Sequence, residues 1–298
     1  MNLGKSLLML LSCICLNFAY TQRSVTNFNN NWSFILEDNP LFSKESVDTL
    51  SWKNINVPHD WSFEKGVRKD GDQGQGGGYH DGGIGWYRKQ FNIKKESLSN
   101  ITYINFDGVY MNSEVWVNGI YIAKRPYGYI SFRYDISKYL KEGNNTIAVR
   151  VDNSLEPSAR WYHPCGIYAQ VKLIEVNPTH FKPNSIFIKT PSIQTNKPTV
   201  TIDAKFKGET KGLKYNVKLF SPDGKLLNSK RVKLKKSQST VQLEVENPKL
   251  WSPESPTLYK AVTQILDGKK IIDEVETTFG FKTVEWKRET GFWLNGKN

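Results

Sequence analysis

Short runs in which apolar and polar residues alternate recur along most of the chain. Residues 101–106 and 113–117 are two examples, and such alternation predicts a β-strand with one buried face. Asn118-Gly119 follows the second run, and this dipeptide predicts a tight hairpin because both residues tolerate positive φ. Helical periodicity is nearly absent, although residues 136–140 predict a single helical turn. Many short strands joined by turns predict an all-β fold built as a sandwich or jelly roll.

A second series of alternating runs follows between about residues 181 and 281. Ser221-Pro222-Asp223-Gly224 and Leu266-Asp267-Gly268-Lys269 predict turns of the kind that join hairpins. About seven short strands in roughly a hundred residues are typical of an immunoglobulin-like sandwich, here without its usual cysteine pair. The predicted strands are residues 185–189, 200–207, 215–220, 230–235, 239–245, 258–266 and 270–278.

The length of 298 residues is enough for about two domains, each with its own core. We expect residues 22–180 to form the first sandwich and residues 181–281 to form the second. Residues 282–298 do not close a domain, but they include Trp286 and Trp293, so we expect them to begin a third unit.

The N-terminal residues 1–21 have the pattern of a secretion signal. Lys5 supplies the positive charge, and the apolar run 7–16 is too short to span a bilayer. Small residues before Gln22 permit cleavage there, so we expect an exported protein, periplasmic or extracellular. No later segment predicts a membrane span. The mature chain would keep one cysteine, Cys165, and therefore no intrachain disulfide.

The net charge of +12 raises the possibility of a nucleic-acid partner. The Lys and Arg residues between positions 207 and 236 interleave with apolar ones, which is the pattern of a solvated strand face. Export also separates the protein from genomic DNA. We therefore expect no nucleic-acid partner.

One stretch of unusual composition runs from Arg160 to Tyr168 and holds a cation, aromatic residues, an imidazole and a thiol. Aromatic rings and a guanidinium can form a sugar-binding face, but these residues alone favour an aromatic anchor for a loop. Cys165 and His163 could form a nucleophile pair, yet no orienting Asn or Asp is evident. We expect a buried, inert thiol.

Residues 71–85 are rich in glycine but lack the Gly-Lys-Ser/Thr signature of a phosphate-binding loop. They predict either a surface excursion or a loop that reaches over a site, with Asp81 near its tip. His59-Asp60 pairs an imidazole with a carboxylate, but adjacency in sequence is not triad geometry, and we expect a structural role.

Several stretches, taken together and in order, resemble glycoside hydrolase family 2, especially its β-galactosidase branch. The resemblance covers essentially the whole mature chain. The stretches that carry it are residues 57–61 (VPHDW), 83–89 (GIGWYRK), 106–109 (FDGV), 115–119 (VWVNG), 160–162 (RWY), 166–168 (GIY), 250–259 (LWSPESPTLY), 279–281 (FGF) and 291–297 (GFWLNGK).

The resemblance implies a jelly-roll sugar-binding domain, an immunoglobulin-like domain and then a (β/α)8 barrel that holds the two carboxylates of a retaining glycosidase. Residues 282–298 match only the lead-in to that barrel, so we expect the chain to lack the barrel and both carboxylates, and we assign no catalytic residue. Asp107 and Glu114 are not expected to replace them. The parent would hydrolyse terminal β-galactosides without a cofactor or metal site in this chain. A β-glucuronidase or β-mannosidase type relative, or a free-standing secreted carbohydrate-binding or adhesion module, remains an alternative.

The resemblance also implies two substrate-binding candidates. Arg160 matches a family loop that contributes a polar side chain to the terminal sugar subsite, and Asp81 lies just before the Gly-Trp-Tyr match, where a second loop reaches that subsite. His163-Pro164-Cys165 stand where many relatives have small residues, and Ala169 stands where many have Arg. These departures leave the sugar preference open.

Overall fold

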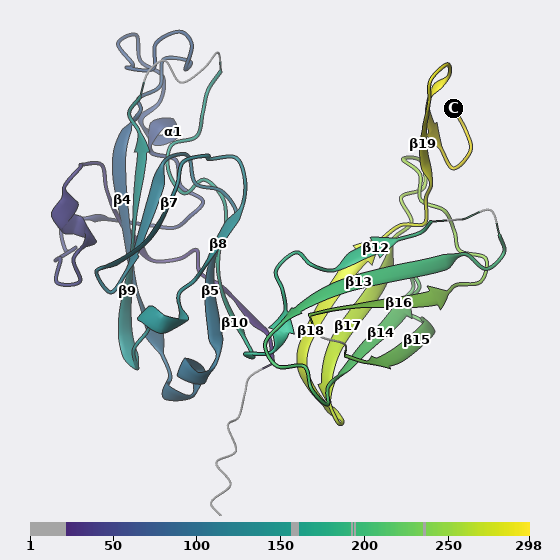
Figure 1. Ribbon diagram of the computed structural model, residues 1–298. Helices are drawn as coiled ribbons and strands as arrows, with labels where there is room; N and C mark the ends of the chain where they lie inside the picture. The colour runs from purple at the N-terminus through teal and green to yellow at the C-terminus, as the bar shows by residue number, and fades with distance from the viewer. Residues whose placement is uncertain (1–21, 156–160, 192, 194, 235–236) are drawn as a thin grey trace, which may run out of the picture.

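The computed structural model describes residues 22–155, 161–191, 193, 195–234 and 237–298. They form two β-sandwiches in succession, followed by a small hairpin (Figure 1). Within these described ranges, helical structure is confined to one short α-helix and three 3-10 turns, which confirms the predicted all-β fold. These elements are α1 (Trp61–Lys65), η1 (Pro40–Ser43), η2 (Lys95–Ser99) and η3 (Ser137–Tyr139).

The first sandwich packs a six-stranded sheet of order β3-β2-β4-β9-β6-β7 against a four-stranded sheet of order β1-β10-β5-β8. Its strands are β1 (Ser24–Asn27), β2 (Trp32–Ile35), β3 (Lys53–Ile55), β4 (Gly83–Ile93), β5 (Ile101–Phe106), β6 (Ser113–Val117), β7 (Ile120–Arg125), β8 (Phe132–Asp135), β9 (Gly143–Asn153) and β10 (Val171–Val176). The central pair, β4 and β9, is antiparallel over the full length of both strands. Many neighbours in the sheets are distant in sequence, as is usual in jelly-roll folds.

The predicted hairpin and helical turn of the first sandwich are both present. Val117 pairs with Ile120 across Asn118 and Gly119, whose φ angles are 50° and 76°. Positive φ at both central residues matches the twist of the flanking strands. The turn predicted at residues 136–140 is the 3-10 turn η3.

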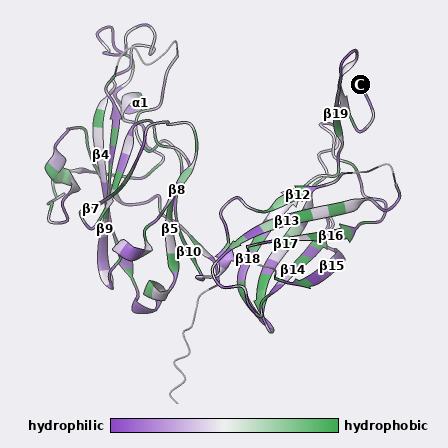
Figure 2. Ribbon diagram, viewed as in Figure 1, coloured by the Kyte–Doolittle hydropathy of each residue, from purple (hydrophilic) through white to green (hydrophobic). Residues whose placement is uncertain are grey.

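Alternating side chains fill the space between the two sheets. Trp32, Tyr87 and Phe106 are buried there, and Figure 2 shows hydrophobic residues recurring along these strands. The opposite face of the six-stranded sheet carries a smaller cluster around Trp86, which stacks on Trp116 at 5.1 Å between ring centres. The period of two therefore places aromatic side chains on both faces.

The second sandwich contains all seven predicted strands, with ends shifted by a few residues, and a two-residue strand β11. One sheet has the order β15-β14-β17-β18, and the other places β13 between β12 and β16. The strands are β11 (His180–Phe181), β12 (Phe187–Lys189), β13 (Thr199–Lys207), β14 (Lys214–Phe220), β15 (Leu226–Lys233), β16 (Gln238–Glu244), β17 (Tyr259–Asp267) and β18 (Lys270–Phe279). Val200, Tyr215 and Ala261 are among the fully buried residues of its core.

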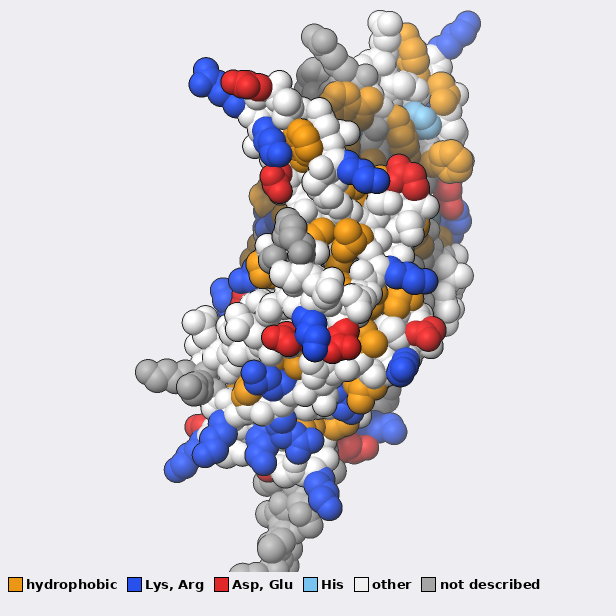
Figure 3. Space-filling view, turned by 90° about the vertical axis from the view of Figure 1, so that its right-hand side faces the viewer, with side chains coloured by type: hydrophobic (Ala, Val, Ile, Leu, Met, Phe, Trp, Pro, Cys, Tyr) orange, Lys and Arg blue, Asp and Glu red, His pale blue; other side chains and the backbone are white. Residues whose placement is uncertain are grey.

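Of the basic residues of β14 and β15, Lys218 is half-buried and the other four are exposed. Lys214 is opposite Lys233, and Arg231 is opposite Asn216. Figure 3 shows Lys and Arg side chains gathered on the lower part of the side of the molecule that it draws. Arg231 and Lys233 thus share one face of β15, whereas Lys230, opposite the buried Val217, lies on the other, so the exposed basic residues do not all belong to one sheet face.

The hairpin formed by β19 (Val284–Lys287) and β20 (Gly291–Leu294) extends away from the second sandwich (Figure 1). Asn295 Nδ2 donates to the carbonyl of Trp251 at 2.9 Å, which ties its base to that domain. The side chain of Trp286 is 78% exposed. Its role as the start of a barrel domain stays a prediction.

Polar contacts join the two sandwiches. Arg23, just before β1, forms a two-pronged ion pair with Asp273 on β18, with both N–O distances at 2.9 Å. The Tyr103 hydroxyl and His180 Nε2 are 3.1 Å apart, and Lys207 Nζ lies 3.3 Å from Asp135. Segments far apart in sequence therefore meet at this junction.

Candidate functional site

The structure describes only one of the two binding residues predicted from the sequence. Arg160 lies outside the described residues, so its role stays a prediction. Asp81 precedes β4, and its side chain is 10% exposed. Lys65 Nζ and Arg68 Nη2 approach its carboxylate at 3.3 and 3.2 Å. Asp81 thus lies in an ion-pair network, at the edge of a 470 Å³ cavity.

The glycine-rich segment around Asp81 is tightly packed. A Cβ on Gly71 would lie 2.1 Å from the carbonyl oxygen of Tyr79, and one on Gly82 would lie 2.3 Å from that of Asn153. The Tyr79 amide in turn donates to the Gly74 carbonyl at 2.8 Å. Close approach of backbone to backbone accounts for these two glycines.

Asp60, which directly precedes α1, forms hydrogen bonds both with that helix and with the loop that follows Arg160. Its carboxylate caps α1 by accepting from the amides of Ser62 and Phe63, at 3.0 and 3.2 Å. The same group accepts a hydrogen bond from the Cys165 amide at 3.2 Å and another from the Tyr162 hydroxyl. One carboxylate therefore satisfies a helix N-terminus and anchors the loop.

His59 is buried, and its contacts are structural. Its amide donates to the Ile167 carbonyl at 2.8 Å, and Nδ1 lies 2.8 Å from the Tyr87 hydroxyl. Burial lowers the pKa of His59, opposed by the charge of Glu64, whose carboxylate is 3.4 Å from Nε2. Burial thus favours the neutral imidazole.

The Cys165 thiol is also buried, and it accepts a contact from Asn153 Nδ2 at 2.9 Å. Burial raises its pKa to about 11, so little thiolate exists at neutral pH. The His163 ring stacks on Tyr110 at 4.8 Å, and its Nδ1 is 2.5 Å from the Tyr129 hydroxyl. The thiol and the imidazole thus have separate surroundings, as expected for an inert cysteine.

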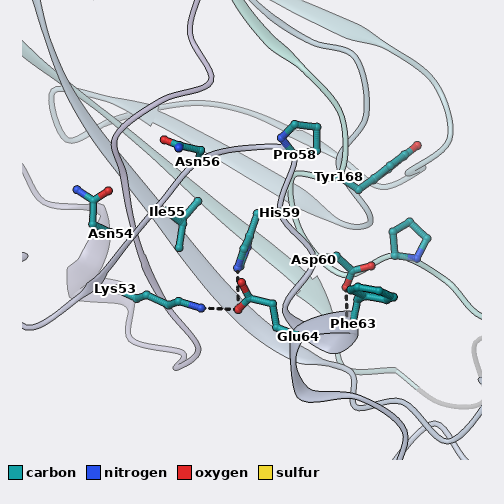
Figure 4. Close-up of a pocket in the computed structure, with 11 residues that line it drawn as sticks. Lys53, Asn54, Ile55, Asn56, Pro58, His59, Asp60, Phe63, Glu64 and Tyr168 are labelled. Atoms are coloured by element: carbon teal, nitrogen blue, oxygen red, sulfur yellow. Dashed lines mark hydrogen bonds and ion pairs between the residues drawn. The ribbon is translucent and has the colours of Figure 1, made fainter.

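A cavity of 640 Å³ lies beside α1 and is lined by residues of β3, of α1 and of the segment that connects them, together with Pro164 and Tyr168 (Figure 4). Glu64 projects into it and pairs with Lys53 at 2.6 Å, and this contact lowers the pKa of Glu64. Asp60 also lines the cavity, but it is the helix cap. Both carboxylates are thus engaged, so this cavity suits binding of a polar molecule better than acid–base chemistry.

The other carboxylates considered from the sequence are likewise paired. Asp107 binds Lys172 at 2.7 Å, whereas Glu114 lies 3.5 Å from Arg150. They belong to different sheets of the sandwich and so do not form a pair for glycoside chemistry. Within the described ranges, no group of three His, Cys, Asp or Glu side chains is placed to hold a metal ion, and no helix is long and apolar enough to cross a membrane.

An aromatic cluster near the Arg160 loop was not predicted. Trp161, in the stretch whose aromatic residues were expected to anchor a loop, is 62% exposed, and its ring centre lies 5.8 Å from that of His163. Tyr127 and Tyr129, from the loop between β7 and β8, extend the same cluster. The Tyr-Gly-Tyr run at 127–129 is the sequence feature that could have indicated this cluster. A Cβ on its glycine, Gly128, would lie 2.4 Å from the Tyr110 ring, so only a glycine leaves room for that ring.

Known families match both sandwiches. The model for "Glycosyl hydrolases family 2, sugar binding domain" matches residues 25–178, and that for "Glycosyl hydrolases family 2" matches residues 179–282. A crystal structure of a beta-glycosidase from Bacteroides vulgatus superimposes with a TM-score of 0.87 at 37% identity, over 92% of this chain and 36% of that one.

Two curated relatives extend the comparison. A Formosa agariphila protein named "Putative beta-glucuronidase" is 70% identical over 99% of this chain and 28% of its own length. "Beta-galactosidase BoGH2A" from Bacteroides ovatus is 36% identical over 92% of this chain and 33% of its own length. The chain thus spans about a third of the length of these relatives. It belongs to glycosyl hydrolases family 2 and corresponds to the N-terminal portion of the family's members.

Proposed function

We propose that this chain is the N-terminal portion of an exported β-glycosidase that removes terminal β-linked galactose from oligosaccharides. The first sandwich would form one wall of the substrate entrance, the second would act as a spacer, and this chain would supply no catalytic residue. The observation that carries the proposal is the ordered match of both family domains over residues 25–282. The glycosidase names of relatives three times as long support a catalytic parent over a free-standing binding module.

The charge around Asp81 supports a neutral terminal sugar. The cavity beside Asp81 is lined by five carboxylate side chains and only two cationic ones, Lys65 and Arg68. The five are Glu37, Asp38, Asp70, Asp72 and Asp81. If this wall faces the terminal subsite, its excess negative charge opposes the carboxylate of a glucuronide, whereas carboxylates accept hydrogen bonds from galactose hydroxyls.

A β-glucuronide is the second candidate substrate. The observation in its favour is the name of the 70% identical relative from Formosa agariphila. In that case Arg160 would be the natural partner of the substrate carboxylate, because a guanidinium binds carboxylates with two parallel hydrogen bonds.

The test compares kcat/KM of the full-length enzyme on the p-nitrophenyl β-galactoside and the p-nitrophenyl β-glucuronide. We expect the galactoside to be preferred at least tenfold, and Arg160→Ala to lower kcat/KM on it by about tenfold or more. Arg231→Ala, an equal loss of charge on β15, serves as the control and should leave kcat/KM unchanged. Preference for the glucuronide would refute the galactoside proposal, and an unchanged Arg160→Ala variant would remove Arg160 from the site.

Export is tested separately by N-terminal sequencing of the protein purified from the organism that produces it. We expect the mature chain to begin near Gln22, because the small residues that permit cleavage precede it. A cytoplasmic protein that retains residues 1–21 would contradict export.

A further inference from the structure

The junction between the two sandwiches contains a cavity of 350 Å³. Three cationic side chains line it: Arg23 before β1, Arg133 on β8, and Lys182 after β11. No Asp or Glu is among the described residues of its lining. The half-buried side chains of Ile186 and Val275 add an apolar side. Convergent charges beside an apolar surface are typical of a small-molecule site.

Arg133 has unused hydrogen-bonding capacity. Its Nε donates to Asn105 Oδ1 at 3.0 Å, and its guanidinium carbon lies 5.8 Å from the centre of the Tyr103 ring. These contacts fix the plane of the guanidinium. Neither terminal nitrogen of Arg133 has a hydrogen bond or an ion pair with any described residue. Two parallel donors are thus held in place for an external acceptor.

The carboxylates nearest these cations are already engaged. Asp273 accepts from Arg23 and from the Phe181 amide at 2.7 Å. Asp107 accepts from Lys172 at 2.7 Å and from Asn105 at 2.8 Å. Burial and the neighbouring positive charge of Arg23 together lower the pKa of Arg133. Among the described residues, the positive charge facing the cavity therefore lacks a full counter-charge.

We propose that this cavity binds the carboxylate of an acidic sugar unit. Arg133 would receive the carboxylate through its terminal nitrogens, with Lys182 adding charge from the rim. Ile186 and Val275 would pack against the C–H face of the ring. A volume of 350 Å³ lies near the lower end for ligand sites and suits a single sugar unit. The inference does not depend on which glycoside the full-length enzyme hydrolyses.

The test is calorimetric titration of the whole chain with methyl β-D-glucuronide, methyl β-D-glucoside and sodium sulfate. We expect the glucuronide to bind at least tenfold more tightly than the glucoside, because only the glucuronide carries the carboxylate. Arg133→Gln should weaken glucuronide binding about tenfold or more. Lys218→Gln on β14 removes the same charge outside the cavity lining and should leave binding unchanged.

Several results would overturn the proposal. Equal affinity for the glucuronide and the glucoside would exclude the carboxylate as the recognised group. Equal weakening by Arg133→Gln and Lys218→Gln would reveal only non-specific attraction. Equal affinity for sulfate and the glucuronide would overturn the assignment to a sugar. Thermal unfolding checks that Arg133→Gln folds, and if it does not, Lys182→Gln on the exposed rim replaces it in the same comparison.

Discussion

The ion pair between Arg23 and Asp273 allows a direct test of how the two sandwiches are held together. The substitution is Arg23→Ala. The Asp273 side chain is fully buried and that of Arg23 is 17% exposed, so the alanine leaves a buried carboxylate without its cation. Removing one partner of a buried pair costs roughly 3–5 kcal/mol. Asp273 keeps the amides of Phe181 and Glu274 as donors, at 2.7 and 3.0 Å, which favours the lower end of that range.

We therefore expect Arg23→Ala to lower the free energy of unfolding of the second sandwich by about 3 kcal/mol. For a domain of about a hundred residues this corresponds to a fall in Tm of about 12 °C. Differential scanning calorimetry of the whole chain measures it. The control is Lys197→Ala, which breaks the Lys197–Glu246 pair of the same sandwich, where the side chains are 61% and 69% exposed. Surface pairs contribute little, so its Tm should hardly change.

A double variant separates the buried charge from other effects of the substitution. Asp273→Asn removes the negative charge, so Arg23→Ala combined with Asp273→Asn should be more stable than Arg23→Ala alone. If Arg23→Ala lowers Tm no more than Lys197→Ala does, the ion pair does not stabilise the junction and the reasoning is wrong.

Three further predictions concern the first sandwich and the junction. Gly166→Ala should lower Tm far more than Gly212→Ala. Both glycines have positive φ, but only at Gly166 would a Cβ clash, because it would lie 2.1 Å from the Tyr87 hydroxyl. Equal shifts of Tm in the two variants would contradict this reasoning. Burial lowers the pKa of His59 and of His180, so below pH 6.5 the unfolded chain binds more protons than the folded chain. Tm should therefore fall when the pH is lowered from 7.5 to 5.5, and it should fall less in the variant with Gln at both positions. A rise of Tm on acidification would contradict the lowered pKa of the two histidines. In the chain that begins at Gln22, where Cys165 is the one cysteine, the thiol should react with a thiol reagent at pH 8 only after unfolding, and rapid reaction of the folded protein would show it to be accessible.

Local sequence determined the strands and several turns. Alternation with a period of two needs only one buried face per strand, so it predicted the seven longer strands of the second sandwich. Asn118-Gly119 closed its hairpin because the preference for positive φ resides in those two residues. The helix α1 was missed, because five residues are too few for a helical period to be recognised.

The candidate binding residues could be predicted only in part. Family resemblance pointed to Asp81, but its pairing with Lys65 and Arg68 depends on how the glycine-rich segment folds back. The aromatic residues of the stretch 160–168 were expected to anchor a loop, yet Trp161 is largely exposed. A single sequence gives the type of a loop residue but not the direction in which its side chain points.

The order of strands in the sheets and the junction between the sandwiches were decided by tertiary structure alone. Arg23 and Asp273 are 250 positions apart, and no local pattern relates them. The same holds for the cavity that Arg133, on the edge strand β8, shares with Lys182 of the second sandwich. Alternation and turn residues act over a few positions, so the sequence by itself determined two β-sandwiches, while the family came from the resemblance of its ordered motifs. Contacts between distant segments depend on how whole sheets pack, and only the folded chain shows which charges they bring together.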